Sequence, residues 1–164
     1  MATFFGVLLG TPKNAVPPVS IPNTFENGRQ QVIARDRITL AAAAIADLVE
    51  MARNIPWETV LDVHQCQFSF AALGAGSTVS IGDGATNPAA LSAAISTAVA
   101  TKGVDALAAV AIANHHKPLW QLFGYATLAA ARAVTPACTI YAKIGGAAAT
   151  GLMTWQFMGV RRMT

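Results

Sequence analysis

Short segments in which apolar and polar residues alternate run through much of the chain after residue 36. Alternation places one face of a β-strand toward a core and the other toward water. The strand-like segments, rich in β-branched, aromatic or alternating apolar residues, are 37–40, 60–70, 77–82, 138–144 and 153–157. The pattern predicts a mainly β protein, even though alanine makes up about a fifth of the chain and favours helix.

The apolar face changes within the segment 60–70. Leu61 and Val63 share one face, and from Cys66 onward the apolar residues lie on the other. A strand of this kind needs a bulge, or it passes from one sheet to the other.

The last two segments are separated by Gly145 and Gly146, which favour a turn. Segments 138–144 and 153–157 are therefore predicted to form a hairpin with an apolar face. Trp155 and Phe157 lie on that face and are predicted to be core residues.

The middle of the chain is harder to assign. Leu91, Ile95 and Val99 recur at helical spacing behind Pro88, so we expect a short helix near Pro88–Ala100. Periodicity leaves open whether 104–114 is a helix or a buried strand. Many short strands without a βαβ rhythm favour an antiparallel β-sandwich with one or two short helices.

We assign residues 37–164 to this sandwich domain and residues 1–36 to an extended N-terminal arm. Proline residues within the arm fix φ and cannot donate ladder hydrogen bonds. The arm's apolar residues still need burial, so the arm is predicted to pack on a partner. The alternative is that it folds back and covers an edge of its own sheet. The predicted partner-binding anchors are Phe4, Phe5, Leu8 and Leu9.

The composition suits a protein that works within an assembly. Charged residues are only 12% of the chain, about half the usual share, and 54% are hydrophobic. The net charge of +3 is scattered, without the basic stripe and stacked aromatics that nucleic-acid binding requires. No stretch reads as a convincing membrane span, and the N-terminus lacks the basic region of a signal peptide. We expect a product of the cytoplasm with no nucleic-acid or membrane partner.

The sequence shows no constellation typical of catalysis or metal binding. His64 and Cys66 are spaced to share a strand face, but no second ligand pair completes a tetrahedral site. The motif around Gly74 and Gly76 lacks the third glycine and the helix of a nucleotide-binding loop. The carboxylates show no acid–base pairing. We therefore predict a protein that is not an enzyme, with no cofactor, no metal, no small-molecule substrate, and two free buried thiols.

Several segments resemble the small virion proteins of tailed bacteriophages. The matching segments are MATFFGVLLG (1–10), the Pro-containing arm, RITLAAAAIADLVEM (37–51), WETVLDV (57–63), FAALGAGSTVSIGD (70–83) and TIYAKIGGAAATGLMTWQF (139–157). The likeness covers most of the chain, and ALGAGSTVSIGD is its most specific part. The residues from Gly84 through the alanine-rich middle have no counterpart.

The resemblance implies a capsid decoration or cement protein with a jelly-roll-like β-sandwich. Such proteins sit on the outer capsid surface as dimers or trimers and bridge neighbouring subunits of the major capsid protein. The resemblance brings no catalytic residues. Two alternatives stay open: a tail or neck structural protein, which shares this composition, and a small holin-like membrane protein.

Overall fold

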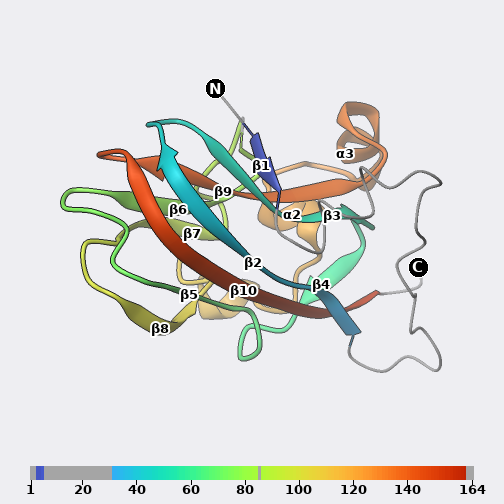
Figure 1. Cartoon of the computed structure of the whole chain (residues 1–164). Coiled ribbons are helices and arrows are strands. Elements are labelled where there is room, and N and C mark those ends of the chain that lie inside the picture. The colour runs from blue at the N-terminus through green and yellow to red at the C-terminus, as the bar shows by residue number, and fades with distance from the viewer. Residues whose placement is uncertain (1–2, 6–30, 85, 162–164) are drawn as a thin grey trace, which may run out of the picture.

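The computed structural model describes residues 3–5, 31–84 and 86–161, and Figure 1 shows two packed β-sheets. The order of sheet A is β1 (Thr3–Phe5), β3 (Leu48–Ile55), β9 (Cys138–Gly145), β6 (Thr78–Gly82) and β7 (Ser92–Ser96). The order of sheet B is β2 (Gln31–Ala43), β10 (Ala149–Arg161), β5 (Gln67–Phe70) and β8 (Thr101–Asp105), and β4 (Thr59–Leu61) also pairs with β10.

The strand pairing is that of a jelly roll. β2 pairs with β10, β3 with β9, β5 with β8 and β6 with β7, all antiparallel. The chain is thus a long hairpin whose ends are β2 and β10 and whose tip is the β6–β7 connection. Rolling such a hairpin so that its strands divide between two sheets produces a jelly roll. The predicted mainly β antiparallel sandwich is confirmed.

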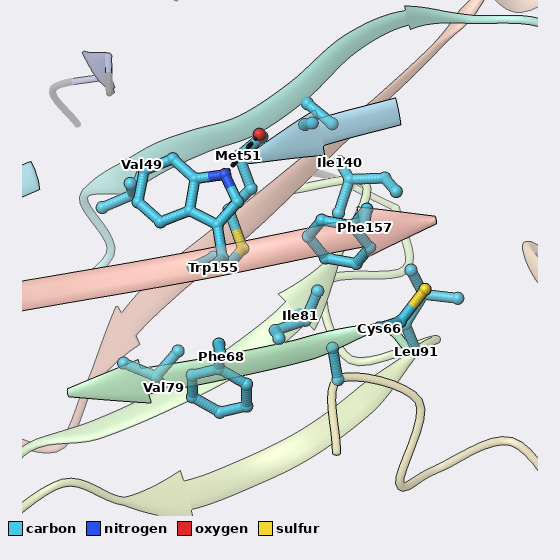
Figure 2. Close-up of a cluster of buried hydrophobic side chains, with 14 of the residues drawn as sticks. Val49, Met51, Cys66, Phe68, Val79, Ile81, Leu91, Ile140, Trp155 and Phe157 are labelled. Carbon is cyan, nitrogen blue, oxygen red and sulfur yellow. Dashed lines mark hydrogen bonds between the residues drawn. The ribbon is translucent and has the colours of Figure 1, made fainter. Parts of the chain in front are cut away.

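The core lies between the sheets, and β9 and the middle of β10 contribute every second residue to it. On β9 the inward residues Cys138, Ile140, Ala142 and Ile144 are all fully buried. On β10 the inward residues Met153, Trp155 and Phe157 face them, so the predicted core positions of Trp155 and Phe157 are confirmed. The indole nitrogen of Trp155 donates a hydrogen bond of 2.7 Å to the carbonyl oxygen of Met51 in the opposite sheet (Figure 2).

The helices within the described residues lie in the connection between β8 and β9. They are a 3₁₀ turn η1 (Ile112–Asn114) and the helices α2 (Leu119–Leu122) and α3 (Leu128–Val134). Arg132 of α3 forms an ion pair with the buried Glu58, and the indole of Trp57 donates to the carbonyl of Thr135 at 2.9 Å. These contacts hold α3 at one end of the sandwich.

The helix expected near Pro88–Ala100 is wrong, because that segment contains β7. Leu91 is fully buried, whereas Val99 is 73% exposed, so the residues at helical spacing do not share a buried face. Pairing with β6 aligns Ile95 with Val79, and the backbone hydrogen bonds of the sheet outweigh helix propensity. The segment 104–114, for which periodicity left helix and strand open, contains the last two residues of β8, followed by turns and η1.

The predicted bulge or sheet crossing in 60–70 is also wrong. A turn separates β4 from β5, and both strands pair with β10 in sheet B. Asp62 holds this turn with two acceptor groups. Its backbone carbonyl accepts hydrogen bonds from the amides of Gln65 and Cys66, and its side-chain carboxylate accepts one from the amide of His64. This turn, rather than a bulge, changes the parity of the buried residues.

The predicted hairpin of the C-terminal segments is wrong in its pairing. Both strands exist, but β9 belongs to sheet A and β10 to sheet B. Their apolar faces meet across the core instead of lying on one sheet. Two segments that each have one apolar face can bury it by facing each other, and alternation cannot distinguish this from pairing side by side.

Candidate functional site

Of the four residues predicted to anchor the arm on a partner, the structure describes two. Phe4 and Phe5 belong to β1, which pairs in parallel with Leu48–Glu50 of β3 at an edge of sheet A. For Thr3–Phe5 the structure shows the alternative, an arm segment folded back along an edge of its own sheet. Contact of the arm with a partner stays a prediction. These three residues precede the prolines, so their amides are free to pair. Leu8 and Leu9 lie outside the described residues.

The predicted boundary between arm and sandwich at residue 36 falls inside a strand. β2 begins at Gln31, and Ala34 and Asp36 already alternate inward with buried side chains. The last part of the predicted arm thus belongs to sheet B.

Four loops without any charged residue meet at one end of the sandwich. They are 41–46, 71–76, 97–100 and 146–152, and we call this surface the uncharged end. The first segment includes the last residues of β2, and the last segment includes the first residues of β10. In Figure 1 the connections β2–β3, β5–β6, β7–β8 and β9–β10 gather on the left of the molecule. The exposed large apolar residues of this end are Ile45 (59% exposed), Val99 (73%) and Leu152 (42%).

Hydrogen bonds between the loops join them into one surface. The amide of Ala42 donates to the Thr150 hydroxyl at 3.0 Å. The amide of Thr150 donates to the carbonyl of Leu73 at 2.8 Å, and the amide of Leu73 to the carbonyl of Thr97 at 2.9 Å. Each loop is thus bonded to its neighbour, so the uncharged end is ordered before any partner arrives.

The backbones of two of these loops are in direct contact. Gly146 has a φ of +69°, and a Cβ atom there would lie 2.0 Å from the carbonyl oxygen of Gly76. Only glycine allows this approach and this dihedral angle together. The uncharged end therefore depends on the glycine at position 146.

Two alanines of the first loop adopt the left-handed conformation. Ala42 has a φ of 53° and Ala46 a φ of 72°, which is unfavourable for residues with a Cβ atom. The buried Asp47 holds the turn, since its carboxylate accepts from the amide of Ala44 at 2.9 Å. The amide of Ala46 donates to the carbonyl of Ile144 at 2.8 Å. Strain of this kind, held by surrounding bonds, is typical of functional surfaces.

Sequence reasoning did not predict this surface. The sequence feature that could have indicated this surface is the absence of charged residues from the runs AAAAIA, AALGAG and GAAATGL, which lie far apart in the chain. Only the strand order brings them together, because Ala42 and Thr150 are separated by 108 positions.

The cysteine and histidine side chains that could bind a metal do not come together at one site. Cys66 and Cys138 are free, buried thiols, whereas His64 is exposed on the turn before β5. Within residues 3–5, 31–84 and 86–161, no group of three or more His, Cys, Asp or Glu side chains is arranged to hold a metal ion. Also within that part of the chain, no helix is both long enough and apolar enough to cross a bilayer.

We expect the buried thiols to make the protein less stable at alkaline pH. Burial raises the pKa of the Cys66 thiol from 9.0 to about 12, and burial also raises the pKa of Cys138. Above pH 9 the unfolded chain releases thiol protons that the folded chain keeps, so the free energy of unfolding falls as pH rises toward 12. Urea unfolding at pH 8.0 and pH 10.5 should show the loss, and Cys66→Ala should reduce it. An equal loss in that variant would contradict this explanation.

Comparison of the chain with protein-family models, with curated protein sequences and with solved structures finds no match.

Proposed function

We propose that the chain is a structural virion protein of a tailed phage, a capsid decoration or cement protein that docks through its uncharged end. Its partners are the major capsid protein and further copies of itself, at the outer capsid surface. The observation that carries the proposal is the uncharged end, with Ile45, Val99 and Leu152 exposed on four interlocked loops. The resemblance of the sequence to small virion proteins supports the same assignment.

The physical character of the uncharged end suits a lasting contact. The cores of protein interfaces are depleted of charged residues, because burying a charge costs solvation energy that the contact has to recover. Alanine and glycine let the partner approach the backbone closely, and Ile45 and Leu152 supply apolar area. The loops are held by hydrogen bonds before binding, so little conformational entropy is lost on docking.

A single charge placed in the uncharged end tests the proposal. Ile45→Lys should leave the fold intact, because the side chain is 59% exposed. It should abolish binding to shells of the phage's major capsid protein, since the lysine would be desolvated in the contact. Co-sedimentation of purified protein with the shells measures binding, and cryo-electron microscopy of the decorated shell locates the contact.

The matched control places the same charge elsewhere. Ile112 is 86% exposed on η1, in the connection that carries the helices. Ile112→Lys should bind shells as the unchanged protein does. Full binding by Ile45→Lys, or a density map with another surface against the shell, would contradict docking through the uncharged end. Binding to purified tails instead of shells would overturn the capsid assignment in favour of a tail or neck protein.

A further inference from the structure

A shallow hollow lies on the outer face of sheet B. Its volume is about 680 Å³, and its lining includes Arg35 and Arg37 of β2, Gln67 and Ser69 of β5, and Thr154 and Gln156 of β10. These three strands are neighbours in the sheet, with β10 in the middle (Figure 1). The hollow is therefore formed by a sheet surface and not by loops.

The strand register arranges these six side chains as two parallel rows. Arg35 stands opposite Gln156, which stands opposite Gln67. In the second row, Arg37 stands opposite Thr154, which stands opposite Ser69. Each row thus begins with a guanidinium group and continues with uncharged hydrogen-bonding groups.

The charge of this face is positive. Arg35 and Arg37 are exposed, and neither forms an ion pair among the residues that the structure describes. Asp36, between them in sequence, is buried, and its carboxylate accepts the backbone amide of Arg37 at 2.7 Å.

The neighbouring strand β8 adds one negative charge to this face, since Asp105 stands opposite Gln67. Lys102 and Asp105 are both exposed there, and the Asp105 carboxylate accepts the amide of Leu107 at 2.8 Å. Arg35 and Arg37 outnumber Asp105, so the face keeps a net positive charge.

We propose that this face binds an extended acidic segment of a partner protein, with carboxylates at alternate positions. Alternate residues of a β-strand are about 6.6 Å apart, so Arg35 and Arg37 have the spacing of two carboxylates that lie two residues apart in an extended chain. Each guanidinium can bind one carboxylate through two parallel hydrogen bonds. The amide nitrogens of Gln67 and Gln156 already donate within the protein, to His64 and to Gln65 and Met158. Their carboxamide oxygens can each accept a hydrogen bond from a peptide N–H of the segment. The proposal does not depend on docking through the uncharged end.

The test uses two labelled peptides of equal charge. One is a dodecapeptide of alternating Glu and Ser, and the other contains the same residues as Glu-Glu-Ser-Ser repeats. Fluorescence anisotropy with the full-length protein at low ionic strength should show tighter binding of the alternating peptide. Arg35→Gln and Arg37→Gln should each weaken that binding about tenfold, the loss expected for a charge-assisted hydrogen-bonded pair. Both variants should melt at the temperature of the unchanged protein, because the side chains are exposed.

Lys117→Gln is the control for net charge, since it also removes one positive charge but lies before α2, outside the hollow. It should bind the alternating peptide normally. Equal affinity for the two peptides, no binding of either, or an equal loss in Lys117→Gln would overturn the proposal. Tighter, arginine-dependent binding of a twelve-nucleotide oligothymidylate would also overturn it, by assigning the face to nucleic acid.

Discussion

Replacing Trp155 with alanine should lower the free energy of unfolding by about 3–5 kcal/mol, the range found for large aromatic side chains removed from cores. Trp155 is only 3% exposed and lies between the sheets with Val49, Met51 and Phe157 (Figure 2). The substitution removes this packing and leaves the Met51 carbonyl without its 2.7 Å indole donor. Urea denaturation followed by circular dichroism measures the loss.

Two further variants separate the causes of that loss. Trp155→Phe keeps most of the apolar volume but removes the indole donor, so it should cost about 1–3 kcal/mol, the penalty of one unsatisfied buried acceptor. Leu152→Ala on the same strand should change stability little, because Leu152 is 42% exposed. An unchanged unfolding midpoint for Trp155→Ala would mean that this face of β10 does not lie in the core.

Replacing Gly146 with alanine should destabilise the protein by about 2–4 kcal/mol, combining the cost of a positive φ for alanine with that of overpacking. The new Cβ atom would lie 2.0 Å from the carbonyl oxygen of Gly76, and backbone cannot move aside as a flexible side chain can. The β5–β6 and β9–β10 loops would have to separate. The variant should therefore lose both stability and, under the proposed function, binding to capsid shells.

Gly124→Ala is the matched control for this effect. Gly124 also has a positive φ, +82°, but a Cβ atom there would meet nothing within 4 Å. It should show the backbone cost alone, about 1 kcal/mol. The difference between the two unfolding free energies measures the steric contact between the loops. Equal losses in the two variants would mean that the loops at the uncharged end are not in close contact.

The local structure of several segments could be predicted from sequence because it depends on side-chain alternation alone. Residues 138–144 and 153–157 each place apolar groups at every second position, and only a strand puts such groups on one face. The same reasoning located Trp155 and Phe157 in the core, and all these assignments hold. Where periodicity was accidental, as for Leu91, Ile95 and Val99, the prediction of a helix was wrong, because backbone pairing with β6 decided the conformation.

Side-chain alternation and composition were enough to predict a charge-poor β-sandwich with an apolar core, because both can be read from a few neighbouring residues. The placement of β9 and β10 in different sheets came from the folded structure, because an apolar face does not specify which other face covers it. Folding also brings together the residues of both candidate surfaces, the uncharged end and the outer face of sheet B. Ala42 meets Thr150 across 108 positions, and Arg37 stands opposite Thr154. Such neighbours follow from strand order and register, which long-range packing selects from many local alternatives with the same alternation.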